Sequence, residues 1–357
     1  MTHPPATPST TGRPPAARGF ASDNQASVHP EILAALAACN DGHQPAYGDD
    51  DVTARLREIV KRRFGDRAEV YPVFNGTGAN VVSLQALSER WSAVICPETA
   101  HVNTDECGAA ELIGGLKFVT APTEDGKLTP AQVEALAKDA DDVHRRRPAV
   151  VSITQSTELG TVYTAGEITA IAAAAHERGL SLHVDGARIA NAAASLGVPL
   201  RAITTDAGVD VLSFGGTKNG LLLGEAVVVL NPDAVRGVEY LRKASMQLAS
   251  KMRYVSAQLV ALLEGDLWLR NAAHANAMAA RLADAARAVP GVEIVRPVEA
   301  NAVFAILPRD AADRLRKRFP FYTWDEETGE VRWVCSFDTT EEDVDAFAAA
   351  LAAELSG

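Results

Sequence analysis

The stretch Val209–Gly220, VDVLSFGGTKNG, joins an apolar run to a glycine-rich turn that carries one lysine, Lys218. An apolar run without alternation is typical of a parallel strand that is covered on both faces. A lysine usually lies in water on an exposed surface. This turn would instead bring its amine to the end of a buried strand, where the glycines leave space around it. The stretch therefore predicts a sheet of buried strands and a candidate site at its edge.

Similar apolar runs alternate with helical patterns along most of the chain. They are SAVICP (92–97), LKFVTAP (116–122), AVVSIT (149–154), LSLHVD (180–185) and EAVVVL (225–230). Strands that alternate with helices predict an α/β fold with a mostly parallel central sheet and crossover helices. One helix start is marked by Thr164 and Glu167, which have the spacing of a capping box.

The pattern changes in the last part of the chain. After Pro232 it predicts an almost unbroken helical stretch to Ala288, followed by short strands and helices that end in an alanine-rich helix. The first residues are rich in Pro, Thr and Ala and lack the apolar segment of a secretion signal. We therefore predict a disordered tail (1–19), a large domain with an N-terminal arm (20–285) and a small C-terminal α+β domain (286–357).

The composition excludes several classes of partner. The chain is 47% hydrophobic and carries a formal net charge of −12, which argues against nucleic-acid and membrane-surface partners because both favour basic faces. No apolar run is long enough to cross a membrane. The four cysteines are far apart and form no C-x-x-C pair, so we expect neither a disulfide framework nor a zinc site. Reduced thiols favour a cytoplasmic protein, and no other cluster of metal ligands is evident.

Two further features lie where strands should end. Asn75–Gly78, NGTG, opens a helix, and glycines there let backbone N–H groups approach an anion. Taken alone, such a segment is more often ordinary turn chemistry, and it matches neither the P-loop nor the dinucleotide fingerprint. His183–Arg188, HVDGAR, places Asp185 at the carboxyl end of a strand, where open α/β sheets bind ligands. Taken alone, Asp185 could equally cap the next helix.

Asp185 and Lys218 follow consecutive strands, so both side chains should project toward one crevice. An amine in a dry site near a positively charged ring loses its proton more readily and becomes a nucleophile. A lysine that forms a Schiff base, a carboxylate on a pyridinium nitrogen and a glycine-rich phosphate cup together describe a site for pyridoxal 5'-phosphate.

The three motifs, in this order and spacing, resemble those of the low-specificity L-threonine aldolases, which are fold-type-I pyridoxal-phosphate enzymes of the threonine aldolase and β-eliminating lyase group. The resemblance runs from about Phe20 to the C-terminus. It extends to three shorter segments, FASD (20–23), YGD (47–49) and VRWV (331–334).

The resemblance implies a role for each matching residue at the cofactor. Lys218 would hold the cofactor as a Schiff base, and Asp185 would pair with the ring nitrogen. Gly76 and Thr77 would donate to the phosphate, and His101 would stack over the ring.

It also implies substrate contacts and an oligomer. Ser22, Arg188 and Arg332 would hold the substrate carboxylate, with Arg188 also near the cofactor. Arg253 would reach the phosphate from a neighbouring subunit, and Tyr47 would contact the substrate. A homodimer or homotetramer with sites at the subunit interface follows from the family.

Each of these residues also has a simpler interpretation. His101 could be an ordinary loop histidine, and Arg332 could lie on the wet face of a strand. Arg253 could be a solvated cation on a helix. Ser22 could be a helix N-cap, and Tyr47 could pack at a dimer contact.

One position departs from the family pattern. Many members carry a second active-site histidine in an Asn-Thr-His motif after the strand that here reads AVVSIT, whereas this chain has Ser156-Thr-Glu158. A carboxylate can accept a proton as an imidazole does, provided that burial raises its pKa. Glu158 is therefore a candidate base. His101 or a water molecule is the alternative, and Glu158 could equally pair with a charge on the surface.

The resemblance implies an aldolase that cleaves L-threonine, L-allo-threonine and related β-hydroxy-α-amino acids to glycine and an aldehyde, through an external aldimine and a retro-aldol step. The alternative is another fold-type-I enzyme, such as a β-eliminating lyase, a transaldolase or an aminotransferase, because the scaffold alone does not decide the reaction. A nucleotide-binding switch protein is disfavoured because no P-loop occurs. An assembly module that keeps the fold without turnover is a further alternative.

Overall fold

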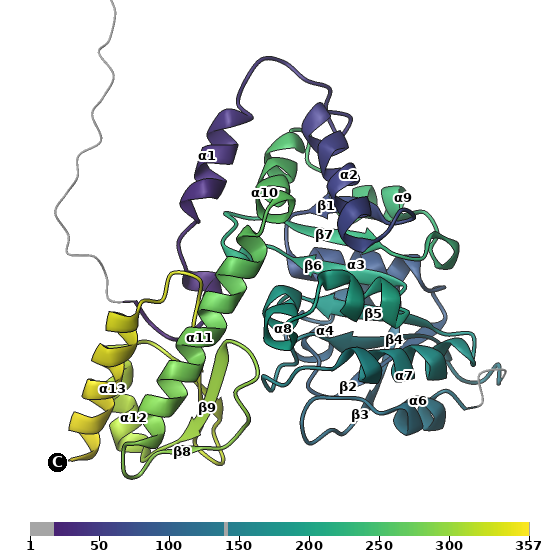
Figure 1. Cartoon of the computed structure of the whole chain (residues 1–357). Coiled ribbons are helices and arrows are strands. Elements are labelled where there is room, and N and C mark those ends of the chain that lie inside the picture. Colours follow the sequence, from purple (N-terminus) through teal and green to yellow (C-terminus); the bar gives the residue numbers. More distant parts are fainter. Residues whose placement is uncertain (1–17, 139–141, 357) are drawn as a thin grey trace, which may run out of the picture.

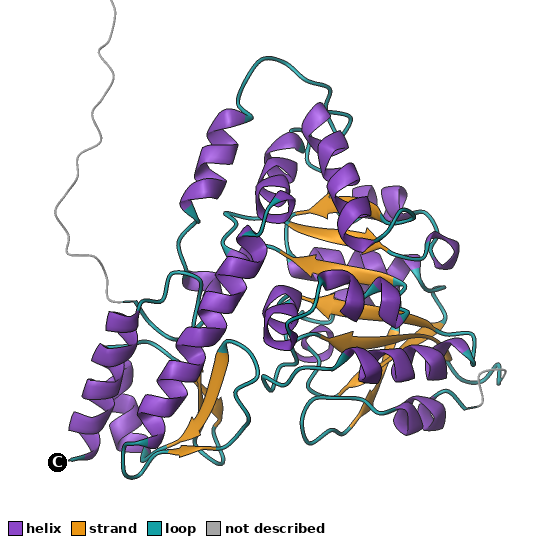
Figure 2. Cartoon of the chain, viewed as in Figure 1, coloured by secondary structure: helices purple, strands orange, loops and turns teal. Residues whose placement is uncertain are grey.

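The structure is a computed structural model of the chain, and it describes residues 18–138 and 142–356. Figures 1 and 2 show a large sheet with helices on both faces, and a second, smaller group of strands and helices beside it. The predicted tail (1–19) lies outside the described residues except for Arg18 and Gly19.

The larger sheet has seven strands in the order β1-β7-β6-β5-β4-β2-β3. β7 runs antiparallel to both of its neighbours, and every other pair that involves β2 to β6 is parallel. The predicted α/β class with a mostly parallel sheet is therefore confirmed. The strands are β1 (Glu69–Val73), β2 (Ser92–Pro97), β3 (Lys117–Ala121), β4 (Arg147–Thr154), β5 (Ser181–Gly186), β6 (Val211–Gly215) and β7 (Glu225–Val229).

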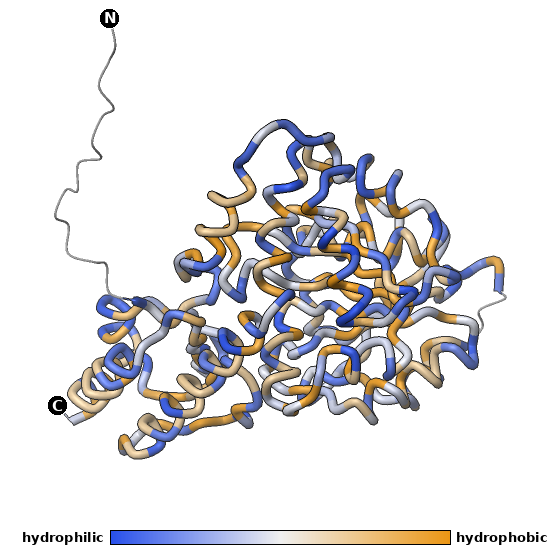
Figure 3. The backbone as a smooth tube through the Cα atoms, turned by 45° about the horizontal axis from the view of Figure 1, so that its top comes forward, coloured by the Kyte–Doolittle hydropathy of each residue, from blue (hydrophilic) through white to orange (hydrophobic). Residues whose placement is uncertain are grey.

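Both faces of this sheet are covered, which explains the apolar runs without alternation. On β6, Val211 packs in the core on one face, and Leu212 packs in the core on the other. The first face is covered by α3 (Gly76–Ala86), α5 (Ala109–Gly114) and α9 (Val238–Ala244). The second face is covered by α2 (Asp51–Phe64), α6 (Pro130–Leu136), α7 (Ala165–His176), α8 (Ile189–Leu196) and α10 (Arg253–Glu264). Figure 3 shows hydrophobic segments mostly in the interior and hydrophilic segments mostly on the outside.

The remaining short elements connect these layers. Helix α1 precedes α2 and packs on α10. The elements are α1 (Pro30–Ala38), α4 (His101–Thr104) and the 3-10 turns η1 (Asp23–Gln25), η2 (Leu200–Ile203), η3 (Thr205–Ala207), η4 (Thr217–Asn219) and η5 (Pro232–Ala234).

The start of α7 has the predicted capping box. The Thr164 hydroxyl accepts from the Glu167 N–H at 3.2 Å, and the Glu167 carboxylate accepts from the Thr164 N–H at 2.6 Å. Two backbone N–H groups that have no partner within the helix are thereby satisfied.

The prediction of an almost unbroken helix after Pro232 is wrong. The stretch is divided into α9, α10 and α11 (Leu267–Arg287), with an irregular segment at residues 245–252. Within that segment Met246 has φ 60°, which a right-handed helix does not allow, and the Ser250 carbonyl accepts from the Tyr47 N–H. Gly265 ends α10 before α11 begins.

A second sheet of four antiparallel strands, in the order β10-β11-β9-β8, packs against α11 and two further helices. Helices α11 and α13 run side by side along it (Figure 1). The elements are β8 (Glu293–Ile294), β9 (Ala302–Ile306), α12 (Arg309–Arg316), β10 (Tyr322–Asp325), β11 (Glu330–Val334) and α13 (Glu341–Leu355).

The two cores share chain segments. Helix α11 continues past the predicted boundary at residue 285. It also spans both cores, because Leu267 packs in the first core and Leu282 packs in the second. Phe20, from the N-terminal arm, is fully buried in the second core, and its carbonyl accepts from the Val334 N–H at 2.8 Å. The division into domains at residues 285 and 286 stays a prediction. Among residues 18–138 and 142–356, no helix is long and apolar enough to cross a membrane.

Candidate active site

The candidate site lies at the carboxyl ends of β4, β5 and β6, on the face that α3 covers. Strands β5 and β6 pair in parallel, with Asp185 opposite Ser213. The end of β6 requires glycine, because a Cβ on Gly215 would lie 2.4 Å from the Ala187 carbonyl oxygen, and the turn begins at Gly216. This turn leads directly into η4, which carries Lys218.

Asp185 is buried and held by two donors. Its Oδ2 accepts from Asn80 Nδ2 at 2.8 Å, and its Oδ1 accepts from the Ala187 N–H at 3.0 Å. The residue at the N-cap of α8 is Arg188, so Asp185 does not cap that helix. Asn80 lies one turn into α3, behind the NGTG segment, and it connects this helix to the end of β5.

The Lys218 amine makes no hydrogen bond or ion pair with the part of the chain that the structure describes. Burial and the neighbouring Arg188 charge lower the pKa of Lys218, whereas the carboxylates of Asp23, Asp185 and Glu225 oppose this shift. An unpaired amine with a lowered pKa is suited to act as a nucleophile.

His101 begins α4 and is held at two points. Its Nδ1 lies 2.9 Å from Glu106 Oε1, and its backbone N–H donates to Glu158 Oε1 at 2.8 Å. The hydrogen bond to Glu106 raises the pKa of His101, although burial acts in the opposite direction. Asp185 and Lys218 both act on the same imidazole through their charges, so His101 shares one environment with them.

Glu158 lies in the loop after β4 and is half satisfied. Its Oε1 accepts from the Thr154 hydroxyl at 2.7 Å as well as from His101. Its Oε2 is buried and has no hydrogen-bond partner among the described residues. Burial raises the pKa of Glu158. Glu158 therefore does not form the surface ion pair that was an alternative for it.

Two arginines lie close together at the edge of the site. Arg188 binds Asp23 with a bidentate pair of hydrogen bonds, at 2.7 Å from Nε and 2.8 Å from Nη2. Arg332, on β11, stacks over the Trp324 ring at 4.7 Å, and its Nε is buried without a partner among the described residues. Burial and the like charge of Arg188 lower the pKa of Arg332 to about 10. An unpaired buried guanidinium next to a second cation is suited to bind an anion.

The predicted phosphate cup is the N-terminus of α3. Asn75 caps the helix, because its Oδ1 accepts from the Gly78 N–H at 2.7 Å. A Cβ on Gly76 would meet nothing within 4 Å, so the space beside the first turn is open. A Cβ on Gly78 would lie 2.3 Å from the end of the Gln247 side chain, so any larger residue there would require Gln247 to move. Gly76 and Thr77 are the first two residues of the helix, whose N–H groups have no intrahelical partner.

Ser22, for which a contact with the substrate carboxylate and a helix N-cap are the two interpretations, is a helix N-cap in this structure. Its hydroxyl accepts from the Asn24 N–H at 3.2 Å, as the N-cap of η1. The next residue, Asp23, binds Arg188, so Ser22 nevertheless lies beside the arginine pair.

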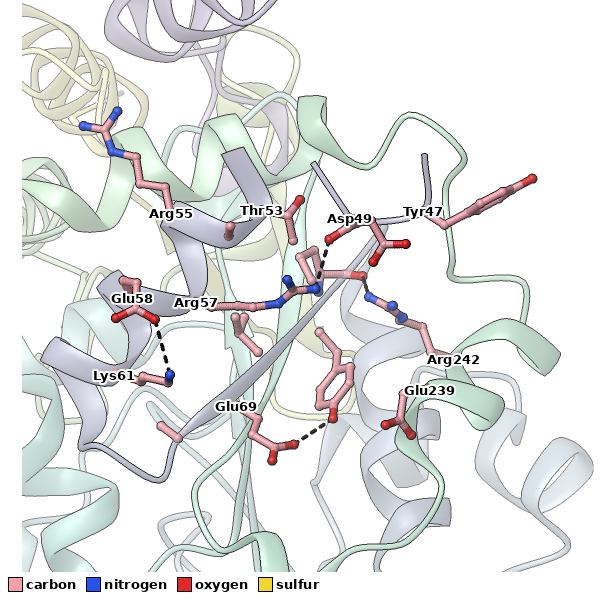
Figure 4. Close-up of a pocket in the computed structure, with 16 residues that line it drawn as sticks. Tyr47, Asp49, Thr53, Arg55, Arg57, Glu58, Lys61, Glu69, Glu239 and Arg242 are labelled. Carbon is pink, nitrogen blue, oxygen red and sulfur yellow. Dashed lines mark hydrogen bonds and ion pairs between the residues drawn. The ribbon is translucent and has the colours of Figure 1, made fainter. Parts of the chain in front are cut away.

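Tyr47 and Arg253 lie away from these residues. Tyr47 lines a separate cavity of about 920 Å³ between α2, β1 and α9, which we name the α2 cavity (Figure 4). Lys243 Nζ lies 5.0 Å from the centre of the Tyr47 ring. Arg253 Nη1 donates to the carbonyls of Asp41 and Gly42, each at 3.2 Å. Neither residue contacts Lys218 or Asp185 within one chain.

Three residues of this site were not predicted from the sequence. Asn80 lies two residues after the segment NGTG and Asp23 belongs to FASD, so a polar residue in or beside each segment was the available signal. Glu106 had no signal, because its contact with Asn80 depends on how α3 packs beside the loop after α4. In the described part of the chain, no group of three or more His, Cys, Asp or Glu could hold a metal ion.

The geometry and the comparisons define the class of protein. Residues 19–309 match the family model for the beta-eliminating lyases. The chain belongs to this family of pyridoxal-phosphate-dependent lyases, and the lysine and aspartate at adjacent strand ends agree with that class.

Within the class, the chain is similar to low-specificity L-threonine aldolases. The protein from Pseudomonas sp. strain NCIMB 10558 is 48% identical, over 94% of this chain and 98% of its own length. The one from Pseudomonas aeruginosa is 49% identical, over 91% and 94%. The solved threonine aldolase of Leishmania major superposes with a TM-score of 0.88 at 31% identity, over 94% and 98%.

Proposed function

We propose that this chain is an aldolase that cleaves L-threonine, L-allo-threonine and related β-hydroxy-α-amino acids to glycine and an aldehyde. The observation that carries the proposal is the unpaired Lys218 amine beside the buried Asp185 carboxylate, in a chain about half identical to aldolases of this kind. The rival reactions on the same scaffold have weaker support: the matched family model is that of the beta-eliminating lyases, but the relatives at 48% and 49% identity are named as aldolases.

The residues present fit pyridoxal 5'-phosphate. Lys218 is free to bond to its aldehyde carbon, Asp185 is fixed for the ring nitrogen, and the open turn at Gly76 and Thr77 suits its phosphate. When bound, this cofactor withdraws electrons from the substrate bond that breaks. The protein supplies orientation, charge and proton transfer.

The two arginines would hold the carboxylate of the amino acid. Arg332 Nε has no partner among residues 18–138 and 142–356, whereas Arg188 uses Nε and Nη2 on Asp23, so Arg332 supplies most of the binding. The Ser22 hydroxyl is a further donor beside them. A carboxylate fixed at one end restricts rotation about the Cα bonds and so selects the bond to be broken.

Glu158 would remove the proton from the β-hydroxyl. Within the described residues its Oε2 has no hydrogen-bond partner, and the contacts to Oε1 fix its position. A carboxylate with a raised pKa is a better base than an exposed one. His101, over the cofactor ring, is the alternative base.

The assembly is proposed to be a homodimer or homotetramer in the cytoplasm. Tyr47 and Arg253 lie outside the cluster of their own chain, which supports their acting on the substrate and the phosphate of a neighbouring subunit. The described cysteines are free thiols, as a reducing compartment favours.

The test is incubation of the cofactor-loaded protein with L-threonine and L-allo-threonine. We expect glycine and acetaldehyde in equal amounts. Glu158→Gln should lower kcat about a hundredfold, because it removes general base catalysis. Glu134→Gln, on the exposed side of α6, is the matched control and should retain full activity.

Two outcomes would contradict the proposal. Formation of pyruvate or a keto acid in place of glycine would indicate another reaction on this scaffold. Full activity in Glu158→Gln, with a large loss in His101→Phe, would transfer the role of base to His101.

A further inference from the structure

We propose that Glu106 is a positioning residue that joins His101 to Asp185 through Asn80 and fixes the tautomer of the His101 ring. The inference deepens the proposed function, because it rests on His101 and Asp185 being the groups on either side of the bound cofactor. Neither Glu106 nor Asn80 has a role in the reaction as described above.

The connection is an unbroken chain of hydrogen bonds. His101 Nδ1 lies 2.9 Å from Glu106 Oε1, and the same oxygen accepts from Asn80 Nδ2 at 2.8 Å. Asn80 Nδ2 also donates to Asp185 Oδ2 at 2.8 Å. One amide group therefore bridges two carboxylates, with one hydrogen for each.

The chain lies in the interior, where its geometry has large consequences. The Glu106 side chain is 1% exposed, and Asn80 and Asp185 are also buried. Two buried carboxylates repel each other, and the Asn80 amide offsets this by donating to both. Glu106 Oε2 and Asn80 Oδ1 have no partner among the described residues, so removing the amide would leave both acids short of donors.

The tautomer of His101 follows from these contacts. An ionised carboxylate only accepts, so Nδ1 of His101 must carry the hydrogen that Glu106 receives. In the neutral ring the other nitrogen, Nε2, is then an acceptor. The imidazole is 41% exposed, so Nε2 remains available to the open side of the site.

The charged groups around His101 come from four segments. They are Glu106 after α4, Asp185 on β5, Lys218 on η4, and Glu158 after β4, which contacts the backbone N–H. The hydrogen bond to Glu106 is the largest influence that raises the pKa of His101, and burial and Lys218 act against it. Loss of the Glu106 charge should therefore lower the pKa of His101 below its wild-type value.

The experiment titrates His101 by NMR in the full chain carrying ¹³C- and ¹⁵N-labelled histidine, with and without pyridoxal 5'-phosphate. The chain has eight histidines, and the His101→Phe spectrum identifies the signal. We expect Glu106→Gln to lower the pKa of His101 by about one unit. Asn80→Ala should leave that pKa raised, yet weaken binding of pyridoxal 5'-phosphate about tenfold, because Asp185 loses a donor.

Glu111→Gln, on the exposed side of α5, is the matched control and should change neither value. An unchanged His101 titration in Glu106→Gln would overturn the inference even if the protein is an active aldolase. Absence of aldolase activity would contradict the proposed function. The titration of His101 without the cofactor would still test the positioning role of Glu106.

A further measurement needs no substitution at Glu106, which could prevent folding. The ¹⁵N shifts of neutral His101 in the wild-type protein report its tautomer. We expect the hydrogen on Nδ1, and a hydrogen mainly on Nε2 would rule out the proposed contact.

Discussion

Two polar regions of this chain, the α2 cavity and the surroundings of Lys218, differ in how far their charged groups are buried and held by partners. The α2 cavity is large, and it holds several cations and acids, among them Arg57, Lys61, Glu58 and Glu69 (Figure 4). Lys61 pairs with Glu58 there, and Glu69 accepts from the Tyr71 hydroxyl. Around Lys218 the groups are buried and fixed by defined partners, and selected atoms, such as Glu158 Oε2, have no hydrogen-bond partner among the described residues.

The difference indicates which of the two regions is suited to bind a ligand. Surface ion pairs contribute little to stability. A buried polar group that keeps one atom without a partner is, in contrast, already positioned to bind a ligand. Arg242 complicates this contrast, because it lines the α2 cavity, is buried, and has an Nε without a hydrogen-bond partner in the described part of the chain. Substitutions in matched pairs can therefore sharpen the comparison or break it.

The largest difference is expected between two lysines. Lys218→Ala should reduce threonine cleavage roughly a thousandfold or more, because the covalent link to the cofactor is lost. Lys61→Ala, in the α2 cavity, should remain near wild type. Glycine release and borohydride fixation of the cofactor are the two measurements, and fixation that survives in Lys218→Ala would refute the assignment of the amine.

A smaller difference is expected between two arginines. Arg332→Met should raise KM for L-threonine by tens of fold, in keeping with about 2 kcal/mol for a charge-assisted hydrogen bond to a carboxylate. Arg57→Met should leave KM near wild type. Steady-state kinetics on both variants provide the check, and an equal rise in KM for Arg57→Met would contradict a specific role of Arg332 in binding the carboxylate.

The last expected effect concerns acid stability. His183 lies between the hydroxyls of Ser152 and Ser213, each at 2.9 Å, and burial lowers its pKa to about 4. In the unfolded chain the pKa is near 6.5, so the unfolded state binds more protons below that pH. Stability should therefore fall by up to about 1.4 kcal/mol per pH unit between roughly pH 6.5 and pH 4.

Urea unfolding at pH 7, 6 and 5, at fixed protein concentration, measures this slope. His183→Gln should flatten it, because glutamine does not titrate. Lys61→Ala should not change it, since the exposed Lys61–Glu58 pair contributes little. An identical slope in His183→Gln and wild type would show that His183 is not the group that charges.

The order of strands and helices was largely readable from the sequence, because local patterns specify it. Apolar runs marked the strands, and the Thr164 capping box marked the start of α7. The break after α9 was missed, since it depends on a contact between Ser250 and Tyr47, which lie more than two hundred residues apart in the sequence. Lys218 and Asp185 could be predicted because the carboxyl ends of neighbouring parallel strands meet at one edge.

The rest of the site depends on contacts that no local pattern encodes. Glu106 meets Asn80 only once the loop after α4 lies beside α3. Asp23 meets Arg188 because the N-terminal arm crosses to α8. Glu158 Oε2 has no hydrogen-bond partner among the described residues, and this depends on the packing around it, which the segment Ser-Thr-Glu does not encode.

The N-terminal arm links two properties of this molecule that are usually separate. Phe20 fills the core beside the smaller sheet, and three residues later Asp23 aligns the Arg188 guanidinium at the edge of the larger one. The segment between them is too short to absorb a displacement at either end. A substitution that repacks the core beside the smaller sheet should therefore also change the affinity for an amino acid, so the stability of that core and substrate binding are coupled.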